Sequence, residues 1–176
     1  MADFKGLGGT EKILCLSKGI MMRDKRFIAV HRGGLLTKEQ HKKLIEWASK
    51  CSEHVFPLVG DNIDNKLFVA LETARKWEEG RATVGDAREA SVNAHSVARE
   101  SSDPVVIAIA RSVGHAVATA HMADHSVGAA LYARRAIECS GKSVDAERQW
   151  QIEQLPTEIK EIVLMLMEDK EKNFKI

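Results

Sequence analysis

The sequence contains few aromatic residues: Phe, Trp and Tyr together account for 5% of its 176 residues. Hydrophobic residues of all kinds nevertheless reach 44%, so the core must be filled mainly by Ala, Val, Leu and Ile. This composition favours close-packed helices over a β-sandwich or barrel, in which β-branched and aromatic side chains usually dominate. The length suits one domain that buries a core of its own.

An excess of charge of either sign is also missing. The chain has 26 Lys and Arg residues against 25 Asp and Glu residues, which gives a formal net charge of +1. Nucleic-acid-binding domains usually carry a basic excess or a basic stripe, and neither is evident here. We therefore expect no nucleic-acid partner.

Paired cysteines and long apolar segments are absent as well. Cys15, Cys51 and Cys139 are far apart and odd in number, which argues against a zinc knuckle or a disulfide framework and predicts free thiols in a reducing compartment. No apolar run approaches the roughly 20 residues that span a bilayer, and the N-terminus lacks the apolar segment of a secretory signal. We expect a cytoplasmic protein without membrane contact.

Helix-capping signals divide most of the chain into helices. Thr37 is followed three residues later by Gln40, the spacing of a capping box, and Thr83 is followed in the same way by Asp86. The Asp-Pro pair at 103–104 is typical of a helix start. Apolar residues between these signals recur at helical spacing, and no segment shows the alternation of a strand. The sequence therefore predicts an all-α fold.

The predicted organisation is a single compact domain of about six to seven antiparallel-packed helices joined by short loops. This all-helical domain is expected to cover residues 23–169. A poorly ordered N-terminal extension is expected over residues 1–22, and a frayed C-terminal tail over residues 170–176.

The Ala-rich segment from Val105 to Cys139 is compatible with helix throughout. One helix of that length would be unusual in a compact domain. We therefore expect a break or tight turn near residues 121–126, with an antiparallel pair of helices on its two sides.

That break decides which histidines can meet. His121 and His125 are four residues apart and would share one face of a continuous helix. His115 lies about 120° around the helix from His121, so it can join the other two only if the helix breaks between them.

The stretch HAVATAHMADH, residues 115–125, is the most chemically loaded segment of the chain. Imidazole and carboxylate groups bind divalent metal ions, and the candidate ligands are His115, His121, Asp124 and His125, with His95 or Glu72 from an adjacent helix. The favoured alternative is structural: Asp124 caps the following helix, and the histidines donate to backbone carbonyls freed at the turn. No ligand stands at a diagnostic spacing such as HExxH. No cofactor is expected, and a divalent metal is the alternative.

Other chemically active residues have simpler interpretations. No serine stands in a GxSxG context and no glycine-rich loop has the lysine of a phosphate-binding loop. Arg111, Arg134 and Arg135 are expected to be solvated, and the alternative is that at least one of them pairs with Glu72, Asp86 or Glu89 within the bundle. Glu72 and Arg75 are expected on a solvated helix face, because structural ion pairs are common. The three tryptophans are expected in the core: Trp47, Trp77 and Trp150.

Several blocks of the sequence together resemble a widespread prokaryotic family, the immunity proteins of polymorphic toxin systems. The blocks are FIAVHRGGLLTKEQHKKLIEWA, LETARKWEEG, VGDAREA and, above all, GHAVATAHMADHSVGAALYA. The resemblance extends from about Arg23 to Met167. It implies a small helical, non-catalytic protein that binds and neutralises a cognate toxin in the cytoplasm, and it implies no catalytic residues.

Two surfaces are candidates for contact with such a partner: the acidic loop Gly60–Asn65 and the polar face around Glu78, Glu79 and Arg81. Two other hypotheses remain open at this point. One is a metal-dependent enzyme or a metal-binding helical bundle that uses the segment His115–His125. The other is a homodimer in which Ala-rich helix faces pack together.

Overall fold

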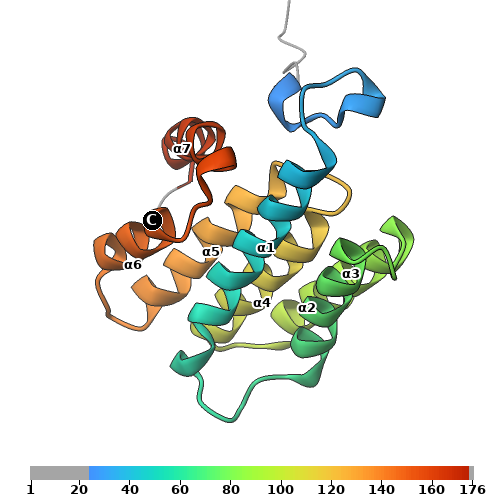
Figure 1. Ribbon diagram of the computed structural model, residues 1–176. Helices are drawn as coiled ribbons and strands as arrows, with labels where there is room; N and C mark the ends of the chain where they lie inside the picture. Colours follow the sequence, from blue (N-terminus) through green and yellow to red (C-terminus); the bar gives the residue numbers. More distant parts are fainter. Residues whose placement is uncertain (1–23, 175–176) are drawn as a thin grey trace, which may run out of the picture.

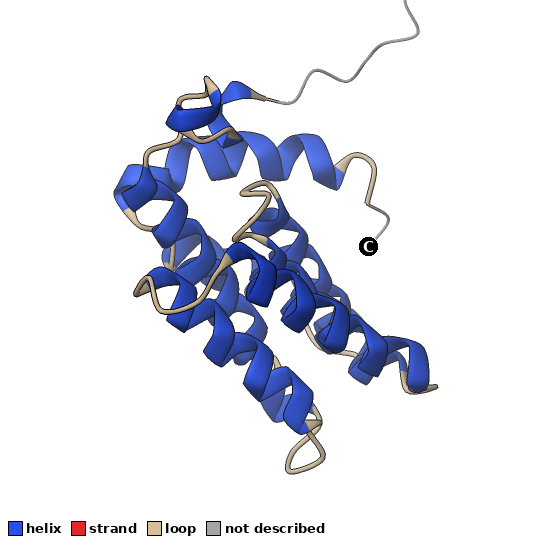
Figure 2. Cartoon of the chain, turned by 90° about the vertical axis from the view of Figure 1, so that its right-hand side faces the viewer, coloured by secondary structure: helices blue, strands red, loops and turns tan. Residues whose placement is uncertain are grey.

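A computed structural model describes residues 24–174 of the chain, and the predicted N-terminal extension over 1–22 lies outside the described residues. Within this range the chain forms seven α-helices and three short 3-10 helices, with no strand among the described residues. The all-α prediction is confirmed (Figure 2). The α-helices are α1 (Lys38–His54), α2 (Asn65–Glu78), α3 (Val84–Glu100), α4 (Pro104–Ala118), α5 (His125–Cys139), α6 (Val144–Glu153) and α7 (Thr157–Glu171).

The helices are arranged around the adjacent pair α4 and α5, which pack against each other more extensively than any other two helices of the described residues. Helix α3 packs against α4, α2 packs against both α3 and α4, and α1 packs against both α4 and α5. Helices α6 and α7 pack against α5 on the opposite side, and α7 is seen nearly end-on in Figure 1 because it crosses the other helices. The short 3-10 helices η1 (Lys25–Phe27) and η2 (Val30–Arg32) precede α1, and η3 (Phe56–Leu58) follows it.

Local capping explains where several helices begin. The Thr37 side chain accepts a hydrogen bond from the Gln40 amide while the Gln40 side chain accepts from the Thr37 amide, so the predicted capping box is present. Thr83 and Asp86 form a second reciprocal box at α3. Asp103 accepts from two amides at the start of α4, as the Asp-Pro signal predicted. Each box satisfies amides that have no partner inside the helix.

The long Ala-rich segment breaks where its length required a break. Helix α4 ends at Ala118 and α5 begins at His125, so a six-residue turn, 119–124, separates two helices that pack side by side. Asp124 occupies the N-cap position of α5, but its side chain makes no capping hydrogen bond. The expectation that this carboxylate caps the helix is therefore wrong, and its actual partner is described below.

Small residues allow the central helices to approach closely. The Ser112 hydroxyl in α4 donates to the Ala129 carbonyl of α5 at 2.8 Å and also contacts the Ser52 hydroxyl of α1 at 2.8 Å. A Cβ atom at Gly114 would lie 2.5 Å from the His95 ring, and one at Gly128 would lie 2.8 Å from His115 Nδ1. Real Cβ atoms essentially never make contacts this short, so these two glycines leave the room that the histidine rings occupy.

Near the C-terminus, α7 continues to Glu171, and the predicted domain boundary at 169 falls inside it. Phe174 then packs edge-on against Tyr132 of α5, with ring centroids 5.1 Å apart. Of the helices in residues 24–174, none combines the length and the apolar character needed to cross a membrane.

Candidate functional site

Histidine side chains form a connected group at the end of the bundle that holds the α4–α5 turn. Ring contacts link His95 to His115, His115 to His125 and His125 to His121, with centroid separations of 5.5, 5.0 and 5.4 Å. Two more histidines, His31 and His41, line a small pocket together with His121. Six of the seven histidines of the sequence therefore gather in one region.

The break between α4 and α5 brings His115 and His125 into contact. Their Nδ1 atoms lie 3.1 Å apart, which is a hydrogen-bond distance. His115 also stacks on Tyr132, with ring centroids 5.2 Å apart. The pKa of His115 is lowered to about 3, first by burial and then by the nearby charges of His125, His95, Lys170 and Arg111. His115 is therefore neutral at physiological pH, because desolvation penalises its charged form.

Of the predicted metal ligands, the three histidines are linked by ring contacts, and Asp124 forms an ion pair with Lys170. His115, His121 and His125 form the continuous run of rings described above. The Asp124 carboxylate instead lies 3.6 Å from the Lys170 ammonium, which also donates to the Asp124 carbonyl at 2.7 Å. Across residues 24–174, no group of three or more His, Cys, Asp or Glu side chains is arranged to hold a metal ion.

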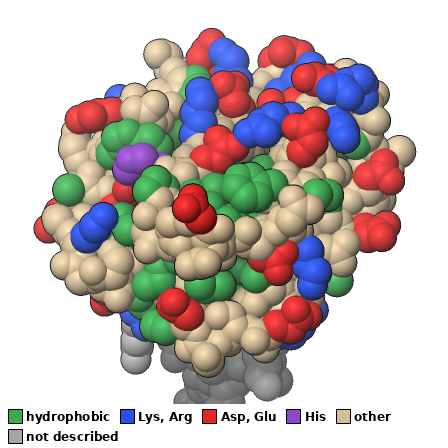
Figure 3. Space-filling model, turned by 90° about the horizontal axis from the view of Figure 1, so that it is seen from below, with side chains coloured by type: hydrophobic (Ala, Val, Ile, Leu, Met, Phe, Trp, Pro, Cys, Tyr) green, Lys and Arg blue, Asp and Glu red, His purple; other side chains and the backbone are tan. Residues whose placement is uncertain are grey.

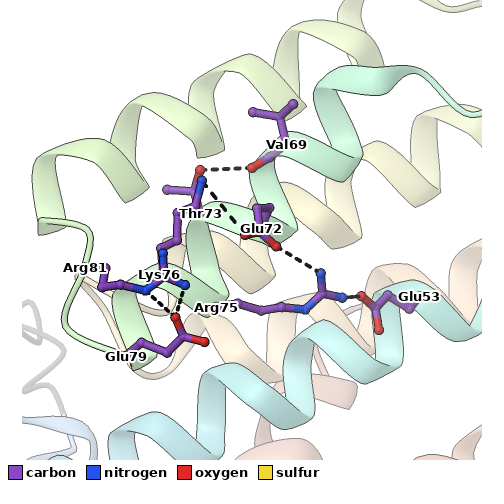
Figure 4. A network of polar contacts seen from close by, with 8 residues as sticks. All are labelled: Glu53, Val69, Glu72, Thr73, Arg75, Lys76, Glu79 and Arg81. Atoms are coloured by element: carbon purple, nitrogen blue, oxygen red, sulfur yellow. Dashed lines mark hydrogen bonds and ion pairs between the residues drawn. The ribbon is translucent and has the colours of Figure 1, made fainter.

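The two further candidates, His95 and Glu72, lie in different surroundings. His95 contacts His115 edge-on, and Arg111 donates to His95 Nδ1 at 3.2 Å. Glu72 instead belongs to an exposed set of ion pairs on α1 and α2, in which it contacts Arg75 at 3.5 Å and Arg75 contacts Glu53 (Figure 4). The expectation that Glu72 and Arg75 are solvated is confirmed.

A pocket of about 120 Å³ lies between the segment that precedes α1 and the α4–α5 turn. We call it the cap pocket, and its lining residues are Phe27, Ile28, Ala29, His31, Arg32, His41, Trp77, Val84, Ala120, His121 and Ala123. His41 Nε2 donates to the Thr119 carbonyl at 2.6 Å, and the His41 ring contacts Trp77 edge-on at 4.9 Å. A histidine of α1 thus bonds a carbonyl of the α4–α5 turn, and sequence periodicity gave no signal for this contact.

A second buried polar group connects α5 to the C-terminal helices, and it corrects a prediction. Arg134 is not solvated: its side chain is 2% exposed, and Nη1 donates to Glu171 Oε1 at 2.6 Å. Glu171 also pairs with Arg148 at 3.1 Å. The signal was present in the sequence, because Arg134 continues the buried helical stripe of Val127 and Leu131.

Close to Arg134, three elements share buried hydrogen bonds. Gln151 donates to the Glu147 carboxylate at 2.9 Å and to the Ala130 carbonyl at 3.1 Å, and Glu147 accepts from His54 at 2.8 Å. His54 stacks on Trp150, with ring centroids 3.5 Å apart. Among the tryptophans, Trp47 is buried as predicted, and its indole N–H donates to the Gln151 carbonyl. These hydrogen bonds and ring contacts hold α6 against α1 and α5.

The surface offers an elongated hollow between α2 and α3. This α2–α3 groove has a volume of about 370 Å³, and its lining residues are Asp64, Asn65, Lys66, Val69, Ala70, Thr73, Asp86, Glu89, Ala90 and Asn93. Val69 is 54% exposed at the groove. The predicted contact loop Gly60–Asn65 reaches the groove through its last two residues. The lower end of the molecule, which carries this loop, shows hydrophobic side chains between acidic and basic ones (Figure 3).

The other predicted contact surface lies on the far side of α2. Glu79 pairs with Arg81 at the end of the helix (Figure 4). Glu78 is half-buried, and its pKa is raised to about 7, first by burial and then by the neighbouring charge of Glu46. A carboxyl group with a pKa of about 7 is partly protonated near neutral pH.

Comparison with known proteins gives one family. A family model described as Imm-5 like putative immunity protein matches residues 34–158. The matched range includes every helix from α1 to α6 and the whole histidine run from His95 to His125. Searches of curated proteins and of solved structures found no match.

Proposed function

The chain belongs to the Imm-5-like putative immunity protein family, and on this premise we propose that it neutralises a cognate toxin in the cytoplasm by binding it, without catalysis. The exposed α2–α3 groove is the observation that supports a binding surface on this chain. Its lining combines the apolar residues Val69, Ala70 and Ala90 with polar residues of both helices. An apolar centre with a polar rim is the usual anatomy of a protein–protein interface.

The charges around the groove indicate the chemistry of the partner. Three carboxylates, Asp64, Asp86 and Glu89, line the groove against one ammonium group, Lys66. A complementary surface would present basic side chains around a small apolar residue, because opposite potentials steer two proteins together and fix their register.

The direct test is co-expression with the products of the adjacent genes. We expect one of these products to be toxic alone, to lose its toxicity beside this chain and to co-purify with it. Neutralisation by binding should reach completion at an equimolar ratio, whereas a catalytic protein would act at a far smaller one. If no neighbouring product binds or becomes less toxic, the proposal fails.

Two variants test the groove within that experiment. Val69→Asp replaces an exposed apolar residue of the groove by a charge and should weaken binding by about 2 kcal/mol or more, the range of an interface hot spot. The matched control is Met165→Asp on α7, where the replaced side chain is 49% exposed and lies outside the groove. Equal effects of the two variants would exclude the groove as the binding surface.

A homodimer through Ala-rich faces is a different proposal, and the fold restricts it. The Ala-rich stretches of α4 and α5 are already buried inside the chain, chiefly against each other, α1 and α3. Any dimer would therefore have to use another surface, and sedimentation analysis of the purified protein would detect it.

A second candidate function is divalent metal binding by the histidine run, with or without hydrolytic chemistry. The supporting observation is the separation of 3.1 Å between the Nδ1 atoms of His115 and His125. Two nitrogen ligands of one tetrahedral zinc ion lie roughly 3.3 Å apart, given zinc–nitrogen distances of about 2.0–2.1 Å. Water or a group of a bound partner would complete the coordination.

Elemental analysis of protein purified without a metal column tests this candidate. Stoichiometric zinc, iron or manganese that disappears in the double variant His121→Ala and His125→Ala would support it. Protein that contains no metal and whose stability does not change on adding zinc would exclude it.

A further inference from the structure

The cap pocket combines features of an anion site, and it lies apart from the α2–α3 groove. Its polar lining consists of Arg32, the indole of Trp77 and the imidazoles of His31, His41 and His121. None of the described residues that line it is an Asp or a Glu. Arg32 therefore supplies a permanent positive charge that no lining carboxylate neutralises.

The size of the pocket limits what it can hold. A volume of about 120 Å³ corresponds to roughly four water molecules at about 30 Å³ each. That space suits a single carboxylate group with a short stem, and it is too small for a nucleotide or a sugar. The apolar part of the lining, which includes Phe27, Ile28 and Val84, would receive the stem, because burial of apolar surface is favourable.

The behaviour of His41 shows that positive charge acts at this place. Burial lowers its pKa, the hydrogen bond to the Thr119 carbonyl opposes that shift, and the charges of His31 and Arg32 lower the pKa further. The permanent charge of Arg32 would also attract an anion. Because a carbonyl only accepts, His41 Nε2 carries its proton, and the ring is held in one orientation at the wall of the pocket.

We propose that the cap pocket binds one carboxylate group, held by the Arg32 guanidinium beside the imidazoles of His31 and His121 and against an apolar wall. Arg is suited to this role because its planar fork matches the two oxygens of a carboxylate. The carboxylate belongs either to an acidic side chain of a protein partner or to a small organic acid. The site is independent of the proposed function, since it requires no contact at the α2–α3 groove.

Acetate is the first probe, added to the full chain while amide and imidazole resonances are followed by NMR. We expect saturable shifts in the millimolar range that centre on Arg32, His41 and residues 119–123. Sodium chloride at the same ionic strength should not reproduce them. Arg32→Gln should weaken acetate binding by about tenfold or more, whereas Arg99→Gln, on the exposed surface of α3 and outside the pocket, should not.

Two further probes distinguish the possible sources of the carboxylate and define the results that would overturn the proposal. N-acetyl-aspartic acid amide carries the carboxylate on a peptide unit, so binding as tight as that of acetate would support a partner's side chain. Binding of acetate alone would support a small organic acid. The proposal is overturned if acetate causes no saturable shift, if Arg32→Gln binds it as well as the unaltered chain does, or if inorganic phosphate binds and acetate does not.

Failure of this site and failure of toxin binding can be told apart. A chain that binds acetate but rescues no toxic neighbour contradicts only the proposed function. A chain that rescues a toxic neighbour but does not bind acetate contradicts only the carboxylate site. Equal melting temperatures for Arg32→Gln and the unaltered chain would show that any loss of binding is local, because Arg32 is exposed before α1.

Discussion

His115 and His125 face each other across the α4–α5 turn with their Nδ1 atoms 3.1 Å apart. At this distance one ring donates a hydrogen bond and the other accepts it, so the contact requires at least one neutral imidazole. Two protonated rings would present two N–H groups and two positive charges to each other. The contact therefore links the packing of the turn to pH.

Acidification should destabilise the protein through His115. Its pKa of about 3 in the folded chain lies below the ordinary value of 6.5, so the unfolded chain takes up a proton first as the pH falls. The stability that neutral His115 contributes is complete above about pH 6.5 and is lost as the pH falls toward 3, by up to about 1.4 kcal/mol per pH unit for one proton. Urea unfolding at neutral and mildly acidic pH measures this loss.

The variant His115→Gln serves as the control for that titration. It should lose less stability than the unaltered chain over the same pH interval, because its side chain has no proton to take up. The pKa values of His41 and His95 are also lowered, chiefly by burial, so a smaller slope should persist. An identical slope in both proteins would mean that His115 is not the group responsible.

Glu78 should change the stability of the protein with pH in the opposite direction to His115. Its pKa is raised from 4.5 to about 7, so the folded chain holds this proton more tightly, and stability falls as the pH rises from about 4.5 through 7. Glu78→Gln should stabilise the chain above neutral pH by about 1 kcal/mol, a figure reduced for the partial exposure of the side chain. Chemical denaturation at mildly alkaline pH checks this, and Glu79→Gln should change stability by less than about 0.5 kcal/mol.

Gly128→Ala should destabilise the protein although alanine favours helix. The added Cβ would lie 2.8 Å from His115 Nδ1 and 3.1 Å from its Cγ, and the ring is held between Tyr132 and His125. Overpacking of this kind typically costs about 1–3 kcal/mol, against a helix-propensity gain of about 1 kcal/mol at most. Thermal unfolding would show the net loss.

A double variant separates the collision from other effects. Gly128→Ala in a His115→Ala background should be neutral or stabilising, since the ring that meets the new methyl group is gone. If the two changes simply add, the short contact is not the cause of the destabilisation.

Two neighbouring arginines allow a matched comparison of buried and exposed ion pairs. Glu171→Gln removes the carboxylate that faces buried Arg134 and also contacts Arg148, and it should cost about 2–4 kcal/mol, because it leaves a buried charge poorly compensated. Glu138→Gln removes the partner of exposed Arg135, and it should cost less than about 0.5 kcal/mol. Denaturant midpoints of the two variants measure the difference, and equal losses would contradict the burial of Arg134.

The sequence was sufficient to predict those features that depend on residues close together along the chain. The capping boxes at Thr37 and Thr83 lie within four residues, and the break in the segment from Val105 to Cys139 was required by its length alone. The burial of Arg134 had a local signal as well, its place in an apolar stripe. An arginine at such a position can be exposed or buried, however, and only the acceptor Glu171 on a distant helix decides between them.

The remaining features depend on contacts between distant parts of the chain. The Asp124 carboxylate has the spacing of a helix cap, but Lys170, 46 residues away, takes it instead. The cap pocket exists only because residues 27–32 lie against residues 120–123. No periodicity within either segment indicates that they meet, so the hydrogen bond from His41 to the Thr119 carbonyl could not be predicted from the sequence.

The fit of Gly128 against His115 has a consequence for how relatives of this chain can vary. Gly128 has no side chain, and the His115 ring occupies the place where its Cβ atom would lie. A larger residue at position 128 therefore requires a smaller one at position 115. A relative with alanine at the position of Gly128 should carry a smaller side chain at the position of His115. Aligned homologues should therefore show correlated substitution at this pair: glycine at the position of Gly128 where the histidine is kept, and a larger residue only where the histidine is replaced.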